Sequence, residues 1–187
     1  MSTVLQQSLI TAEQFETMEA EFPRDLVRGE VVIMPPPGVI HGHICGNLIF
    51  ALESWVRPID LGIVTANDSA VLTERNPDSV RGCDIAFTRW EKLPDRKLPT
   101  GAFRVPPDLV AEVQSPSDRW RDVMVKVAEY LDAGVAEVWV VDPEDRSVDV
   151  FHDDDRKPTR LSGDQVLKSP DILPGFECAV SEFFRHV

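Results

Sequence analysis

The sequence predicts a single domain over residues 1–187, of mixed α/β (α+β) class, in which helices pack against a β-sheet. Two stretches with helical periodicity alternate with short, strongly apolar runs that are bounded by turn residues, as expected for helices and strands of one sheet. The chain has 187 residues, of which 43% are hydrophobic, and this suffices for one buried core. Global disorder is excluded, because disordered chains have a low hydrophobic fraction.

The first elements are a short helix and a strand. Thr11 to Gln14 has the form of a capping box, in which the threonine hydroxyl and the glutamine side chain close the first turn of a helix. Residues 26–34 alternate in polarity around Glu30 and predict one strand, which ends at the prolines 35–37. Glu30 is therefore expected within a strand.

A longer helix and a group of strands come next. Apolar residues recur every four positions over 40–56, as in a helix that packs on a sheet. Three apolar runs follow, at 62–66, 70–72 and 83–88, and turn residues separate them. They predict a meander of short antiparallel strands. Residues 89–107 are rich in proline and charge and predict a long loop, a kind of segment that is often functional.

The second half predicts a strand over 108–114 and then another helix. Ser115 is expected to cap this helix, with Pro116 at its first position. The helix ends at Gly134. Its core-facing side chains are expected to be Trp120, Met124, Val127 and Leu131.

Two further strands, 137–141 and 147–151, are predicted to form a hairpin. Residues 153–155 are three aspartates and are expected at a solvated hairpin end, because the glycine and glutamate spacing of a calcium loop is missing. The remaining residues predict one or two strands and a terminal turn at 181–184.

The charge balance limits how this chain can meet nucleic acid. It has 32 acidic and 19 basic side chains and a formal net charge of −13. Proteins that coat nucleic acid or anionic membranes rely on many Lys and Arg residues that release counterions. Bulk electrostatic binding of that kind is excluded, whereas a small local site for a cation or a phosphate is not.

The cysteines and the apolar runs indicate the compartment. Cys45, Cys83 and Cys178 form neither a CxxC pair nor an even disulfide framework, which favours the reducing cytoplasm. The first twenty residues lack Lys and Arg, and no run of eighteen apolar residues occurs. We therefore expect neither a signal peptide nor a membrane span.

Two carboxylates in apolar strands are the main candidates for chemistry. Glu112 lies inside the strand 108–114, where alternate side chains share a face, so that Gln114 points the same way. Asp84 begins another apolar strand. If this strand lies next to the strand 108–114 in the sheet, Asp84 would lie beside Glu112. Two such carboxylates would repel each other unless a divalent cation or a lysine lay between them. Magnesium suits such a pair, since it binds through one or two carboxylates.

Several segments, taken in order, carry a resemblance to a known family: Arg28–Glu30, Pro35–Pro37 with His41, Asp84–Phe87, Pro107–Ser117, Lys126 with Tyr130–Val135, and Val138–Pro143. Together they resemble the Uma-two family of restriction endonuclease-like proteins, within the PD-(D/E)xK nuclease superfamily. The likeness covers a core of residues 10–155 and leaves 156–187 as a C-terminal extension. It implies a restriction endonuclease-like core, a mixed β-sheet flanked by helices with added β-hairpins.

The resemblance also implies a Mg²⁺-dependent (or Mn²⁺-dependent) endonuclease that hydrolyses phosphodiester bonds of DNA. Asp84 and Glu112 would be the metal ligands, and a lysine would help a water molecule to attack in line. The superfamily pattern expects that lysine two residues after the acid, where this chain has Gln114. Lys126, on the following helix, stands where a migrated lysine would be, and Gln114 would complete the site.

Two further residues are supporting candidates. Glu30 and His41 lie in segments that resemble the family pattern and would extend the metal site or orient the substrate. His41 would also be able to carry a proton near neutral pH. As partners, the resemblance implies DNA as substrate and a homo-oligomer, a dimer; no membrane partner is expected.

A second class of function stays open at this stage. A catalytically inactive nuclease-fold interaction module would retain the acidic pocket, and Gln114 in the lysine position favours it. Paired carboxylates of the glycosidase type are compatible with the spacing but have no separate support. The sequence contains no phosphate-binding loop, nucleophile elbow or HExxH motif.

Overall fold

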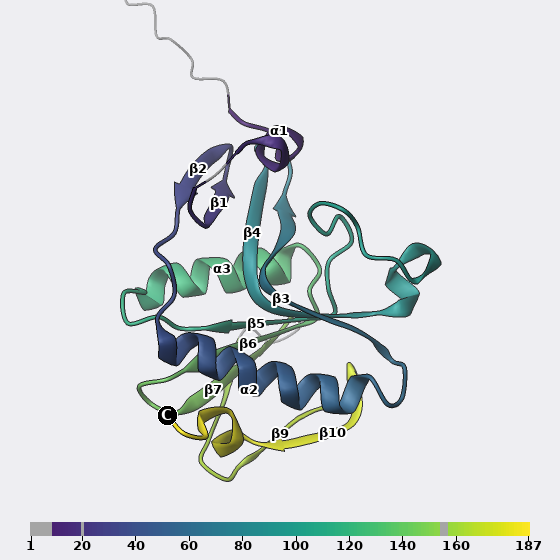
Figure 1. Cartoon of the computed structure of the whole chain (residues 1–187), viewed down its shortest axis with the longest axis vertical. Helices are drawn as coiled ribbons and strands as arrows, with labels where there is room; N and C mark the ends of the chain where they lie inside the picture. The colour runs from purple at the N-terminus through teal and green to yellow at the C-terminus, as the bar shows by residue number, and fades with distance from the viewer. Residues whose placement is uncertain (1–8, 20, 154–156) are drawn as a thin grey trace, which may run out of the picture.

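The computed structural model describes residues 9–19, 21–153 and 157–187 (Figure 1). Its helices and strands, in chain order, are α1 (Ala12–Thr17), β1 (Arg24–Val27), β2 (Glu30–Ile33), α2 (Val39–Val56), β3 (Gly62–Glu74), β4 (Ser79–Arg89), β5 (Leu109–Val113), α3 (Trp120–Asp132), β6 (Glu137–Asp142), β7 (Ser147–His152), β8 (Thr159–Ser162), β9 (Val166–Ser169) and β10 (Leu173–Ala179). Three short 3₁₀ turns, at Trp90–Lys92, Pro94–Arg96 and Val180–Phe184, complete them.

The main sheet has the strand order β2-β1-β4-β5-β6-β7-β8, with β3 paired to β4. The β5 and β6 strands are parallel, and the other pairs are antiparallel. This sheet lies between α2 and α3, and β9 and β10 form a separate hairpin on the α2 side (Figure 1). The mixed α/β class with flanking helices and added hairpins is thus confirmed.

The capping box predicted at the first helix is present. The Gln14 amide N–H donates to Thr11 Oγ1 at 3.3 Å, and the Thr11 N–H donates to Gln14 Oε1 at 2.9 Å. The single strand predicted over 26–34 is wrong, because Arg28 and Gly29 adopt positive φ angles of 49° and 83° and reverse the chain. The result is the β1–β2 hairpin, in which Glu30 begins the outer strand and is exposed.

The predicted helix over 40–56 corresponds to α2. Its side chains with four-residue spacing, Ile44, Leu48, Leu52 and Val56, are buried against the sheet. Residues of β9, β10 and the C-terminal turn share this core, so that the C-terminal segment packs against the main sheet rather than standing apart. Of the aspartates at 153–155, the second and third lie outside the described residues.

The apolar runs 62–66 and 70–72 belong to one long strand, β3, rather than to two. Asn67 and Asp68, with φ angles of 65° and 56°, form a bulge that shifts the register between Ala66 and Ser69 without ending the pairing with β4. The bulge lies opposite Asp84, because the flanking pairs are Ala66 with Ile85 and Ser69 with Cys83. Bulges often occur beside active sites, where they bend a strand and redirect its side chains.

The second predicted helix begins later than expected. Arg119 occupies the N-cap position of α3 without a side-chain capping bond. Ser115 instead closes a turn with Asp118, whose carboxylate accepts the Ser115 N–H at 2.8 Å. Trp120, expected in the core, is 46% exposed because it occupies the first turn of the helix. The buried face consists of Val123, Val127, Tyr130 and Leu131.

The loop predicted over 89–107 is confirmed, with two short 3₁₀ turns and a single bridge between Val71 and Phe103. Asp108 fixes its ends, since its carboxylate accepts the Arg89 N–H at 2.8 Å and lies 3.3 Å from Lys92 Nζ. The three cysteines are unpaired, as expected. Across the described residues, none of the helices combines the length and the apolar character that a membrane span requires.

Asp78 joins the first helix to the β3–β4 turn, and its replacement tests this link. Its carboxylate accepts the N–H groups of Ala12 at 2.8 Å and Asn76 at 3.3 Å and pairs with Arg75 at 3.0 Å. The Ala12 N–H is the main cause that lowers the pKa of Asp78 below 3.8. Asp78→Asn leaves one acceptor oxygen and no charge, so it should lower the free energy of unfolding at pH 7 by about 2 kcal/mol.

The pH dependence of that loss follows from the direction of the pKa shift. A carboxylate whose pKa is lowered on folding stabilises the protein above its unfolded pKa, 3.8, and loses this contribution as the pH falls through the folded pKa. Urea denaturation of the wild type and of Asp78→Asn should therefore give curves that converge below pH 3.8. A difference that persists there would show that the charge is not the cause.

Candidate active site

A cavity of about 460 Å³ lies between the start of α2 and the first half of α3. Its lining includes titratable side chains from β1, β3, β4, β5, α2 and α3, among them Asp25, His41, Asp68, Arg81, Asp84, Glu112 and Lys126. Segments far apart in the sequence thus bring both signs of charge to one place, at the point where β4 leaves its ladder with β5.

Strand register places Asp84 and Glu112 together. Ile85 pairs with Ala111 in the antiparallel β4–β5 ladder. Continued by one residue, this register puts Asp84 opposite Glu112, and opposite residues of antiparallel strands project to the same face. The two charges interact, because Asp84 contributes to a raised pKa of Glu112.

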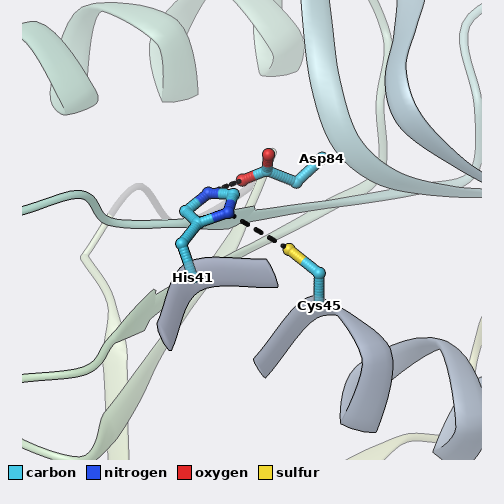
Figure 2. Close-up of side chains that lie close together, drawn as sticks. All are labelled: His41, Cys45 and Asp84. Atoms are coloured by element: carbon cyan, nitrogen blue, oxygen red, sulfur yellow. Dashed lines mark hydrogen bonds and ion pairs between the residues drawn. The ribbon is translucent and has the colours of Figure 1, made fainter. Parts of the chain in front are cut away.

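Asp84 is held through one of its two oxygens. Its Oδ2 accepts the Val113 N–H at 2.7 Å and contacts His41 Nε2 at 3.1 Å (Figure 2). Within the described part of the chain, no donor reaches Oδ1. The hydrogen bond to Asp84 is the main cause that raises the pKa of His41 to about 10, and a contact with Cys45 adds to it. At neutral pH, His41 is therefore an imidazolium that fixes Asp84 and leaves one carboxylate oxygen for another ligand.

Glu112 is 8% exposed and is held through both oxygens. The Tyr130 hydroxyl donates to Oε1 at 2.6 Å, and Lys126 Nζ lies 3.5 Å from Oε2. Burial raises the pKa of Glu112 to about 7 in spite of the opposing effect of Lys126. The negative charge of Glu112 in turn raises the pKa of Lys126, so that Lys126 stays charged. The ionised form of Glu112 thus needs more positive charge than these neighbours supply.

A second ion-pair network supports the cavity from β1 and β4. Arg81 donates to Asp25 at 3.1 Å and forms a two-bond pair with Glu129 at 2.6 and 2.8 Å. Asp25 also accepts the Gly82 N–H at 3.0 Å, and its Oδ2 lies 3.9 Å from Lys126 Nζ. Asp25 links this network to the cavity, because it contacts both Arg81 and Lys126.

The structure brings together five of the six residues singled out from sequence. Asp84, Glu112, Gln114, Lys126 and His41 all line the cavity. Gln114 lies just beyond the end of β5, where its N–H donates to Val141. Glu30 is apart from them, exposed on β2 and outside the cavity lining.

Sequence reasoning missed three residues of this arrangement. Asp25 is an acid beside the apolar pair Leu26–Val27, the same signal that singled out Asp84 and Glu112, and it could have been found. Arg81 gave a weaker signal of the same kind, as a charge inside a strand. Tyr130 gave none, since a tyrosine in the apolar stripe of a helix reads as an ordinary core residue.

Comparisons with known proteins identify the family and the fold. A family model described as "Uma2: Putative restriction endonuclease" matches residues 12–181. No curated protein matches the chain. Among solved structures, the chain is similar to a crystal structure described as "a putative nuclease belonging to DUF820" from Anabaena variabilis ATCC 29413. The two share 20% identity with a TM-score of 0.80, over 94% of this chain and 98% of the other. This likeness confirms the predicted restriction endonuclease-like fold.

Proposed function

The chain belongs to the Uma2 family, and from this premise we propose that it is a Mg²⁺-dependent endonuclease that hydrolyses phosphodiester bonds of DNA. The observation that carries the proposal is the meeting of Asp84, Glu112 and Lys126 in one cavity. Two carboxylates on adjacent strands with a lysine 3.5 Å from one of them are the groups that metal-assisted phosphodiester hydrolysis needs.

The donor set fits magnesium. Mg²⁺ prefers oxygen ligands and is commonly bound through one or two carboxylates, with water and substrate phosphate filling the other positions. Asp84 Oδ1 accepts no hydrogen bond from the described residues, and burial of Glu112 favours a cation beside it. Asp84 and Glu112 are therefore the residues that would hold Mg²⁺, or Mn²⁺ in its place. When bound, such an ion polarises a phosphoryl oxygen and makes its water more acidic.

The remaining residues position these two carboxylates and the substrate. Tyr130 orients Glu112 through its hydroxyl, while His41 and the Val113 N–H orient Asp84. Lys126 carries a proton-bearing ammonium into the cavity, where it would hold the attacking water or a phosphoryl oxygen. Gln114, on the same rim, would donate to the substrate with its amide. His41 would in addition be able to donate a proton to the leaving oxygen.

Removing the lysine should slow the reaction without removing the metal. Lys126→Met keeps most of the side-chain length but loses the ammonium, so the cleavage rate at saturating Mg²⁺ should fall about a hundredfold. Single-turnover cleavage of a labelled duplex measures the rate, and calorimetry measures Mg²⁺ affinity. A loss of metal affinity equal to the loss of rate would contradict a role for Lys126 in positioning water.

Contact with DNA is proposed to be local. The net charge of −13 does not support a broad basic surface. Arg24 and Arg119 line the cavity together with Lys126 and would meet phosphates beside the scissile bond. A homodimer would extend this surface by presenting two cavities to one duplex. Light scattering of the purified protein, with and without DNA, would determine the oligomeric state.

One observation favours a second function, an inactive nuclease-fold module that binds a partner. The buried acids already have protein partners, Glu112 with Lys126 and Asp25 with Arg81, and Gln114 replaces the usual lysine. Calorimetry with Mg²⁺ and Mn²⁺ separates the two functions. A nuclease should bind the ion with an affinity that falls at least tenfold in Asp84→Asn. Absence of such binding would rule out the enzyme and leave the module.

A further inference from the structure

His41, Cys45 and Asp84 form a group of metal-binding side chains that the proposed reaction does not explain in full. His41 and Cys45 lie four residues apart in α2 and so share one face of the helix, and Asp84 faces them from β4 (Figure 2). One ligand atom from each residue can be chosen so that the three lie within 4.8 Å of one another. Magnesium chemistry uses the aspartate but has no use for a thiol.

We propose that His41, Cys45 and Asp84 bind a thiophilic divalent ion of the Zn²⁺ type, and that this ion withdraws Asp84 from the magnesium site. The binding stands on the geometry alone. The effect on cleavage rests on the proposed nuclease function.

The distance between Cys45 and His41 matches zinc coordination. Zinc bonds to sulfur at about 2.3 Å and to imidazole nitrogen at about 2.0 Å, so two such ligands of a tetrahedral ion lie about 3.5 Å apart. Cys45 Sγ lies 3.6 Å from His41 Nδ1. This pair is therefore spaced as two ligands of one tetrahedral ion before any ion arrives.

Asp84 must move to complete the set. It contacts His41 Nε2, on the opposite edge of the ring from Nδ1, so its carboxylate has to leave that hydrogen bond to become the third ligand. The cluster is close enough for such a rearrangement, because one ligand atom from each of the three side chains already lies within 4.8 Å of the others. Asp84 lines the cavity, so this movement would take place beside open space.

The charges balance without any redox change. As the ion binds, the Cys45 thiol and the His41 imidazolium each give one proton to solvent, and two bonds to the metal replace two N–H or S–H bonds. The thiolate and the aspartate together neutralise the two positive charges. With three protein ligands, a fourth position would remain for water, as in an accessible rather than a closed zinc site.

Sharing of Asp84 gives the inference its functional consequence. Joining His41 and Cys45 around Zn²⁺ would shift the Asp84 carboxylate from the position in which it is proposed to hold Mg²⁺ with Glu112. Zinc should therefore inhibit Mg²⁺-dependent cleavage, and the inhibition should require the thiol.

Cobalt binding to the full chain tests the site directly, because a thiolate bound to Co²⁺ gives an intense near-ultraviolet charge-transfer band. The wild type should show this band at one ion per chain, and Zn²⁺ should displace the Co²⁺. Cys178→Ser, which alters the other half-buried thiol, should retain the band, whereas Cys45→Ser should lose it. A band that persists in Cys45→Ser, or the absence of a band in the wild type, would overturn the proposal.

The role of Asp84 needs its own variant. Asp84→Asn should retain the thiolate band but bind the ion at least tenfold more weakly, and unchanged affinity would refute the three-ligand site. Circular dichroism and thermal melting establish that each variant is folded.

Inhibition of cleavage by zinc is tested with Cys45→Ser. The cleavage rate with Zn²⁺, divided by the rate without it, should rise toward one in this variant. A chain that gives the cobalt band but cleaves no DNA would refute the nuclease and leave the zinc site standing.

Discussion

Glu112→Gln should lower the rate of Mg²⁺-dependent DNA cleavage by roughly a thousandfold while leaving the fold intact. Glutamine has nearly the same shape and can still accept the hydrogen bond from Tyr130, which lies 2.6 Å from Glu112 Oε1. It loses the charge that would hold the ion. A bound metal contributes several kcal/mol of charge stabilisation in the transition state, and a loss of about 4 kcal/mol corresponds to a thousandfold in rate.

The matched control for this variant is Glu91→Gln, which makes the same chemical change at an exposed carboxylate outside the cavity. Supercoiled, linear, branched and single-stranded DNA should be assayed with both variants in Mg²⁺ and in Mn²⁺. If Glu112→Gln cleaves as fast as Glu91→Gln, the activity belongs to a contaminant or to another site, and the two-carboxylate mechanism fails. Thermal melting of both variants separates a loss of chemistry from a loss of fold.

The sequence predicted those parts of the fold that local pattern determines. The four-residue spacing over 40–56 placed α2, and the capping box placed α1, because each depends on residues within one or two turns. The apolar runs of β5 and β6 identified buried strands. The candidate cavity residues Asp84 and Glu112 were identifiable for a related reason, since an acid inside an apolar strand needs a partner.

The parts that sequence did not predict depend on backbone reversal and on distant contacts. Alternation of polarity continues across Arg28 and Gly29, so two four-residue strands resemble one longer strand, and only the positive φ angles reveal the turn. The predicted strand began at residue 26 and so left out Asp25, which lies on the inner strand of that hairpin. The partners of Asp25 are 56 and 101 positions away, at Arg81 and Lys126, beyond the reach of any local pattern.

Arg81 is the residue whose loss should most reduce stability. It is 8% exposed and pairs with Asp25, which is 2% exposed, and with Glu129. Arg81→Met fills a similar volume but leaves two acids beside the cavity without their main cation. Removing one partner of a buried ion pair typically destabilises a protein by about 3–5 kcal/mol. For a chain of this length we expect a decrease in melting temperature of roughly 10 °C.

Two further variants, one at a surface arginine and one a double variant, separate charge from packing as the cause of the lost stability. Arg57→Met removes an exposed partner of Glu53 and should change stability by less than about 1 kcal/mol. If burial of unpaired charge causes the loss in Arg81→Met, adding Asp25→Asn should restore part of it, because the double variant buries one charge fewer. Additive losses in urea denaturation would instead assign the effect to packing of the arginine side chain. Arg81 would then matter for its volume, and the ion-pair network would not be what fixes Asp25 beside Lys126.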